Sequence, residues 1–136
     1  MTTNKTFYFI SGLPRSGSTL LSSILNQNPR FSASISDSLI SFAKGYITAV
    51  ESHQGMKSMV SEEKLKDMVI DLFNSYYKDK NEVCFNTNRG WTAETGFLKS
   101  VFPKVKMIVC MRHIPWILDS FEILDRKSPN TLKPMY

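Results

Sequence analysis

Gly12-Leu13-Pro14-Arg15-Ser16-Gly17-Ser18-Thr19 is the stretch of this sequence that most strongly predicts its fold. Two glycines enclose four residues, which is the Gly-x-x-x-x-Gly frame of a phosphate-binding loop. The preceding run, Phe7–Ser11, is short, aromatic and β-branched like a buried strand, and the following run, Thr19–Leu25, has helical spacing. The backbone N–H groups of such a loop and the positive end of the following helix dipole converge on a bound anion. The segment therefore predicts an anion site between a strand and a helix.

Predicted strands and helices alternate along the rest of the chain. Further strands are predicted at Glu82–Asn86 and Lys106–Met111 from their apolar runs. Helices are predicted at Leu39–Val50, from Ser61 to Asp79, at Thr92–Val101 and at Ile114–Asp125, with Asp37, Ser61 and Thr92 as N-caps of the first three. This order predicts an α/β fold, a P-loop-like three-layer domain with a short parallel sheet flanked by helices and ligands at the carboxyl ends of the strands. We expect residues 1–136 to form one domain.

Composition restricts the classes of ligand and the cellular location. Lys and Arg number 17 against 12 acids, giving a net charge of +5, which suits an anionic ligand. The basic residues are scattered, so we expect neither a nucleic acid nor a membrane as partner. The sequence has no signal-peptide pattern and no run of about 18 apolar residues, which predicts a cytoplasmic protein. Cys84 and Cys110 lie in predicted strands and are expected to be buried free thiols.

The loop differs from that of nucleoside triphosphatases at the residue after Gly17. That position normally holds a Lys that reaches the β and γ phosphates, but here it is Ser18. A cation stands inside the loop instead, as Arg15, whose planar fork suits a tetrahedral oxyanion. No acid follows a strand in the place that would hold Mg²⁺, so the sequence favours transfer without a metal.

The segment Pro14–Leu21 is similar to the 5′-phosphosulfate loop of sulfotransferases, in the form found in tyrosylprotein and bacterial members. The resemblance implies 3′-phosphoadenosine-5′-phosphosulfate as co-substrate and no metal. It implies that Arg15 contacts the phosphosulfate, and that Pro14 and Ser16–Thr19 surround the 5′ phosphate. The alternative is a Gly/Ser turn with a surface arginine.

A second match begins at the end of the third predicted strand. Cys110-Met111-Arg112-His113-Ile114-Pro115 is followed by Ser120, eight residues after the arginine. This spacing resembles the family's 3′-phosphate motif, with its usual Asn-Pro displaced here to Ile114-Pro115. The resemblance implies that Arg112 and Ser120 hold the 3′ phosphate of the nucleotide. The alternatives are an arginine that caps its own loop and an exposed serine.

Two residues are candidates for the reaction itself. Asn88-Arg89-Gly90-Trp91 is similar to an Arg-Gly-Trp of bacterial relatives, whose preceding Lys is absent here, so Arg89 is either a sulfonate contact or an ordinary loop arginine. Asp37 falls near the Glu of tyrosylprotein members, and we consider it either as the base or as a helix N-cap. His53 and His113 are expected to be solvated.

The leading hypothesis is a sulfotransferase that moves a sulfuryl group to a hydroxyl or amine acceptor. A small-molecule kinase and a non-catalytic nucleotide-binding or assembly module are the alternatives. Members of the family usually run to about twice this length, so we expect that the C-terminal part of the typical domain is missing. A homo-oligomer is then an option, because self-association would cover an exposed sheet edge or apolar patch.

Overall fold

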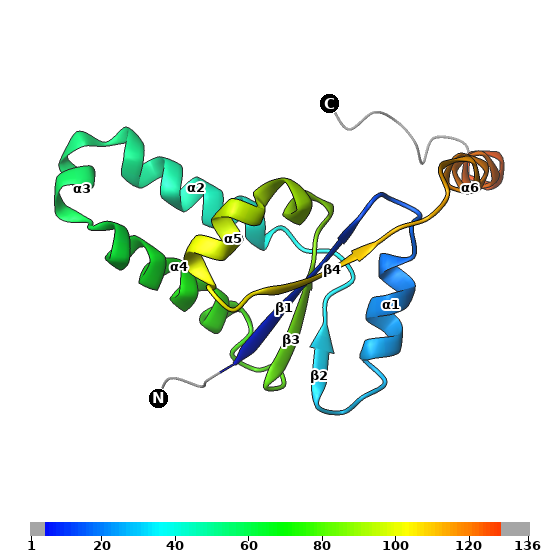
Figure 1. Cartoon of the computed structure of the whole chain (residues 1–136), viewed down its shortest axis with the longest axis horizontal. Helices are drawn as coiled ribbons and strands as arrows, with labels where there is room; N and C mark the ends of the chain where they lie inside the picture. Colours follow the sequence, from blue (N-terminus) through cyan, green and yellow to red (C-terminus); the bar gives the residue numbers. More distant parts are fainter. Residues whose placement is uncertain (1–4, 129–136) are drawn as a thin grey trace.

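The computed structural model describes residues 5–128 as a four-stranded parallel sheet with helices on both faces (Figure 1). The strands lie in the order β2 (Phe31–Ala33), β3 (Val83–Thr87), β1 (Thr6–Gly12) and β4 (Lys106–Cys110). All neighbouring pairs are parallel, so the four carboxyl ends meet at one edge. The predicted three-layer α/β fold is confirmed.

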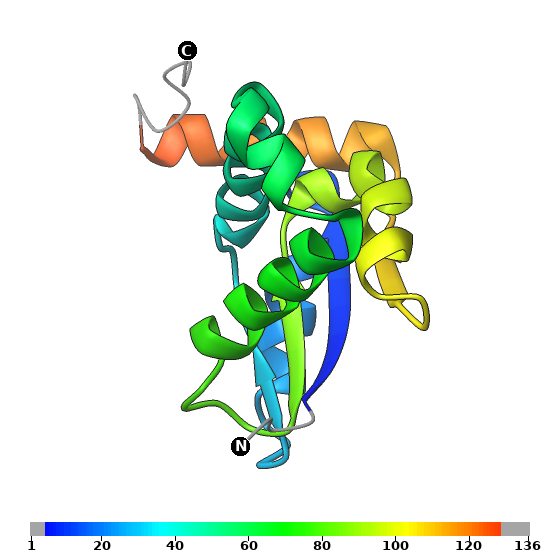
Figure 2. The same cartoon turned by 90° about the vertical axis from the view of Figure 1, so that its left-hand side faces the viewer.

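Helices cover the two faces unequally, as Figures 1 and 2 show. One face carries α1, and the other carries α2, α4 and α5, while α6 extends from the end of β4 beyond the sheet. The bounds are α1 (Ser18–Leu25), α2 (Leu39–Ser52), α3 (Gln54–Met59), α4 (Glu62–Tyr76), a 3₁₀ helix η1 (Arg89–Glu94), α5 (Thr95–Val101) and α6 (Ile114–Lys127). No helix within residues 5–128 is long and apolar enough to cross a membrane.

Two elements were missed by the sequence patterns, the strand β2 and the helix α3. β2 has only three residues, and its pairing partner β3 lies about fifty residues later in the chain. The side chain of Asn26 holds the end of β2 through two hydrogen bonds. Its amide donates to the Ala33 carbonyl at 2.8 Å and accepts from the Ala33 N–H at 2.7 Å. Long-range pairing therefore forms a strand that local periodicity does not predict.

The predicted helix caps have different outcomes. Ser61 caps α4 as predicted, accepting from the N–H of Lys64. The N-cap of α2 is Ser38, although the Asp37 carboxylate accepts from the N–H of Leu39 at 3.1 Å. Thr92 was predicted to be a cap and is not, because Asn88 begins a 3₁₀ turn that takes Thr92 into its interior.

Buried aromatic rings fill the space between the sheet and the helices α2, α4 and α5. Phe9 of β1 meets Trp91 edge to face at 4.9 Å between ring centroids, and Phe73 of α4 packs against both. Such pairs add specific geometry to a large buried apolar area. The core thus fixes η1, which contains Trp91, against the carboxyl half of β1.

Asn86, whose side chain lies in this core, is the centre of a buried polar network. Its Nδ2 donates to the Asp37 carboxylate, at 2.7 and 2.9 Å, and to the Tyr77 hydroxyl, while its Oδ1 accepts from Trp91 Nε1. Burial, with the charge of Asp37, raises the pKa of Tyr77, which keeps the phenol protonated. The network joins β3, α4, η1 and the segment before α2.

β4 is an edge strand among the described residues rather than a fully buried one. Ile108 and Val109 are 40% and 45% exposed. Both cysteines are free, as predicted; Cys84 is buried as predicted, but Cys110, the last residue of this edge strand, is partly exposed. This edge presents apolar side chains beside the ends of the strands.

We expect Asn86→Ala to lower the free energy of unfolding by about 3 kcal/mol, because it leaves a buried indole N–H and a partly buried carboxylate without their partner. Chemical denaturation followed by tryptophan fluorescence measures the change. Asn28→Ala is the matched control, since that exposed amide caps only a local turn to Arg30. Equal losses in the two variants would contradict the network's importance.

Candidate functional site

The loop between β1 and α1 turns through three residues with positive φ. These are Gly12 at +148°, Arg15 at +66° and Gly17 at +109°. A Cβ at Gly12 would lie 2.5 Å from the Cys110 carbonyl oxygen and 2.7 Å from Ser16 Oγ, so the backbone of the loop passes directly against β4. Only glycine fits at the first position of the frame, for both steric and conformational reasons.

The loop leads directly into α1, and the N-terminus of this helix has no side-chain cap among the described residues. Gly17 is the N-cap residue, and within residues 5–128 no side chain bonds to the first N–H groups of this helix. The first turn of any helix leaves its N–H groups without intrahelical partners, and an anion satisfies them well. Ser18 and Thr19 add hydroxyls at the same end. The geometry is that of a phosphate cradle.

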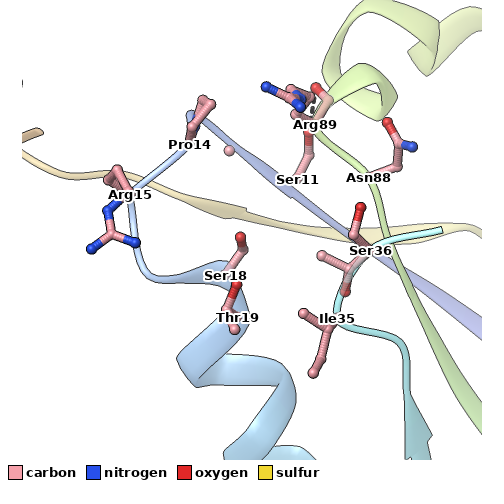
Figure 3. A pocket seen from close by; sticks show the side chains of 11 residues that line it. Ser11, Pro14, Arg15, Ser18, Thr19, Ile35, Ser36, Asn88 and Arg89 are labelled. Atoms are coloured by element: carbon pink, nitrogen blue, oxygen red, sulfur yellow. Dashed lines mark hydrogen bonds between the residues drawn. The ribbon is translucent and has the colours of Figure 1, made fainter. Parts of the chain in front are cut away.

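A polar cavity of about 230 Å³ opens at this point, between the loop and the carboxyl ends of β1 and β3 (Figure 3). Figure 3 shows Ser18 and Thr19 at the top of α1, with Ser36 and Asn88 across from them. The lining consists of Ser11, Gly12, Pro14, Arg15, Ser18, Thr19, Ile35, Ser36, Thr87, Asn88 and Arg89. Two arginines and no acid stand in this lining, which favours an anionic ligand.

The second predicted phosphate motif lies directly against the loop. Arg15 Nε donates to Ser120 Oγ at 2.9 Å, and Arg112 donates to the carbonyl oxygen of Arg15 at 3.1 Å. β1 and β4 end side by side, with Gly12 in register with Cys110. The structure therefore brings Arg15 of the first motif together with Arg112 and Ser120 of the second, although Arg15 and Ser120 are 105 residues apart.

Arg89 lies on the opposite wall of the cavity, as the first residue of η1. Its carbonyl oxygen accepts from the hydroxyls of Ser11 and Thr92, at 3.0 and 3.2 Å, and its side chain is exposed. Asn88 before it is held at both ends of its amide, which donates to the Asp37 carbonyl and accepts from the Gly90 N–H. The backbone that carries the Arg89 guanidinium is thus held firmly, while the guanidinium itself can reach the cavity.

Asp37 does not line the cavity, although Ile35 and Ser36 just before it do. Its two carboxylate oxygens accept from Asn86, Tyr77 and the Leu39 N–H. Ser38, not Asp37, is the N-cap residue of α2, so the predicted capping role of Asp37 is wrong by one residue, although its carboxylate still accepts from the N–H of Leu39 and belongs to the buried network. The predicted role of Asp37 as a base is not tested by these contacts and stays a prediction.

The remaining titratable candidates lie away from the cavity. His53 is exposed at the end of α2, and His113 is exposed before α6, its ring 5.8 Å from that of Trp116. Among residues 5–128, no three His, Cys, Asp or Glu side chains come together in a way that could hold a metal.

Sequence reasoning missed several lining residues that belong to no motif. Ser11 and Thr87 are near the carboxyl ends of β1 and β3, and both are buried. The Thr87 hydroxyl pairs with that of Ser22 at 3.0 Å, which fixes α1 against β3. The only available signal was a polar residue at the end of an apolar strand, which is common wherever parallel strands bind ligands.

The model of the sulfotransferase family matches residues 8–132, a span that includes both the loop and the Arg112–Ser120 segment. No curated protein matches the chain significantly.

We expect Gly12→Ala to destabilise the fold by more than about 2 kcal/mol, because a side chain there combines a strained φ with a clash against the backbone of β4. Gly45→Ala is the control; it lies inside α2 with open space around the position and should be neutral or stabilising by about 0.5 kcal/mol. Thermal unfolding of both variants tests this. Tolerance of alanine at position 12 would show that the loop does not need its close approach to β4.

Proposed function

This chain belongs to the sulfotransferase family, and from that premise we propose that it transfers a sulfuryl group from 3′-phosphoadenosine-5′-phosphosulfate to a hydroxyl or amine acceptor. Family membership supports sulfuryl transfer in general. The identity of the donor and the roles of individual residues are our inference from the geometry of the site.

The contact of Arg15 with Ser120 and Arg112 is the observation that carries the proposal. The proposed donor has phosphates on both its 5′ and 3′ oxygens, so it needs two anion sites one ribose apart. The helix N-terminus with its two hydroxyls supplies donors for one, and Arg112 with Ser120 supplies donors for the other. The donor set therefore fits this nucleotide better than one with phosphates at a single position.

The hydrogen bonds within the site leave its donors usable. Ser120 accepts from Arg15 through its oxygen, so its own hydroxyl hydrogen is available to a phosphate. Arg15 uses Nε in that bond and keeps its terminal N–H groups for the phosphosulfate. We infer that Arg15 stabilises charge on the 5′-phosphate oxygen as it leaves, that Arg89 approaches the sulfonate, and that Pro14 and Ser16–Thr19 shape the 5′ cradle.

In the transfer, the acceptor's oxygen or nitrogen forms a bond to sulfur while the bond from sulfur to the 5′-phosphate oxygen breaks. The electron pair of that bond stays with the phosphate, giving adenosine 3′,5′-bisphosphate, and the acceptor loses a proton. Asp37 is the carboxylate nearest in sequence to the lining, but its oxygens already accept three kinds of hydrogen bond. We propose that its main role is to anchor the Ile35–Ser36 wall.

A non-catalytic nucleotide-binding module is the second candidate function. It is favoured by one observation, that the lining of the cavity contains no Asp, Glu or His among the described residues. The kinase alternative has less support, because position 18 is Ser rather than Lys. Turnover with a panel of hydroxyl and amine acceptors separates an enzyme from a binding module.

We expect adenosine 3′,5′-bisphosphate to bind without Mg²⁺, and Arg112→Ala to weaken it by about 1.5 to 3 kcal/mol, the range for hydrogen bonds to a charged group. AMP, which lacks the 3′ phosphate, should lose almost nothing. Calorimetry at one salt concentration measures both ligands.

Arg126→Ala is the matched control for Arg112, since that exposed arginine pairs with Glu122 on α6 and lines neither the loop nor the cavity. It removes the same charge and should leave both affinities unchanged. Equal losses for the two nucleotides in Arg112→Ala, or an absolute need for Mg²⁺, would contradict the proposal.

We expect Asp37→Asn to lower the free energy of unfolding by about 1 to 3 kcal/mol, because one oxygen that accepts from Asn86 Nδ2 becomes an NH₂ group and two donors then face each other. Below its melting temperature, turnover should fall only in proportion to the folded fraction. A far larger loss of kcat, with unchanged bisphosphate affinity and a changed pH profile, would instead identify Asp37 as the base.

A further inference from the structure

A second cavity, of about 420 Å³, adjoins the phosphate cradle. It opens between the loop, η1 and the carboxyl end of β4, and we call it the β4 cavity. Gly12, Pro14 and Arg89 line both this cavity and the polar one, so the two are adjacent. A molecule in the β4 cavity would sit beside the position proposed for the sulfonate.

The walls of the β4 cavity differ in chemistry from those of the cradle. Leu13, Val109, Met111 and Ile114 contribute apolar side chains that are each between 45% and 88% exposed. Exposed apolar side chains gathered around one concave surface are typical of a binding site for an apolar group. The cavity therefore suits an apolar body rather than a hydrated one.

Arg89 and Arg112 are the charged residues of this lining, and no acid stands among its described residues. Arg112 is the residue proposed above to hold the 3′ phosphate, so Arg89 is the cation left for a second ligand. A guanidinium attracts the face of an aromatic ring and stabilises an oxyanion. Sugars and peptides would bury hydroxyls and amides against apolar walls without partners, which is costly.

We propose that the β4 cavity binds the sulfuryl acceptor, and that this acceptor is a phenol carried on a flat apolar body. The inference rests on the proposed sulfotransferase function and specifies its substrate class. The ring packs on Leu13, Val109 and Ile114, and its oxygen faces Arg89, which the cavity shares with the cradle.

Arg89 favours the phenolate, so the phenol's proton passes to solvent water. The phenolate oxygen then bonds to sulfur as the bond from sulfur to the 5′-phosphate oxygen breaks. The products are an aryl sulfate and adenosine 3′,5′-bisphosphate, which keeps the electron pair of the broken bond. No further reactant is needed.

Cys110 gives a direct measure of occupancy, because it lines the β4 cavity and is partly exposed, while Cys84 is fully buried. Burial raises the pKa of the Cys110 thiol, so alkylation by N-ethylmaleimide is best followed at about pH 9. Intact-mass spectrometry of the full chain reports the rate, with and without 2-naphthol as the probe.

With adenosine 3′,5′-bisphosphate bound, 2-naphthol at ten times its Kd should slow alkylation of Cys110 by about tenfold through mass action. Glucosamine, a polar hydroxyl and amine probe, should give no protection at the same concentration. Equal protection by both probes, or none by 2-naphthol, would overturn the proposal.

Matched variants locate the binding. Val109→Ser should weaken 2-naphthol binding by about fivefold, as expected for the loss of one to two buried methyl groups. Leu118→Ser removes an apolar side chain that is 62% exposed on α6 and lines neither cavity, and should leave the affinity unchanged. Equal effects of the two variants would overturn the assignment to this cavity.

Other occupants give different results. If adenosine fills the cavity, the bisphosphate alone protects Cys110 and competes with 2-naphthol. If a second copy covers it, Cys110 becomes reactive only on dilution, in step with the loss of a dimer mass. Either result overturns the proposal.

Binding of the bisphosphate, measured in parallel by calorimetry, separates this inference from the proposed function. Bisphosphate binding without protection by 2-naphthol overturns the acceptor assignment alone. Failure of the bisphosphate to bind overturns the proposed function, and with it the acceptor role of the cavity.

Discussion

The close approach of the Gly12 backbone to the carbonyl oxygen of Cys110 controls the arrangement of the whole carboxyl edge of the sheet. A Cβ at Gly12 would lie 2.5 Å from that oxygen, so the loop after β1 folds over the end of β4 only with glycine there. This approach puts the loop within hydrogen-bonding distance of the segment after β4. The contacts of Arg15 with Arg112 and Ser120 follow from it.

The two cavities at this edge are lined by Arg15, Arg89 and Arg112, and by no Asp or Glu among the described residues. Arg15 has an unfavourable positive φ, and the bond from Arg112 to its carbonyl helps to hold that conformation. Arg15 and Arg89 both line the cradle, which lies at the N-terminal end of α1. Among residues 5–128 neither arginine forms an ion pair, so an anion bound there would balance their charges.

The wall opposite α1 is rigid because it rests on the Asn86 network and on aromatic packing. Trp91 fixes η1 through a ring contact with Phe9 and a hydrogen bond to Asn86. Asp37, bound to the same amide, fixes the segment that contains Ile35 and Ser36. Buried polar groups that are fully satisfied define one arrangement, and they place the wall at the cavity without themselves lining it.

The sequence by itself determined the strand, loop and helix at residues 6–25, the helical faces and the α/β class, and it contains the two motifs whose resemblance to those of sulfotransferases underlies the proposed function. Each of these depends on residues close together in the chain, where periodicity, capping and glycine spacing act. Only the tertiary structure decided that β2 pairs with β3, that Asp37 is bound by Asn86 and Tyr77, and that Arg15 contacts Ser120. Those contacts join residues 40 to 105 positions apart, and local patterns carry no information about which distant partner will satisfy a buried donor or an unpaired strand. The apolar β4 cavity has the same origin, because its walls come from β1 and the loop after it, η1, β4 and α6, which meet only when β1 and β4 lie side by side.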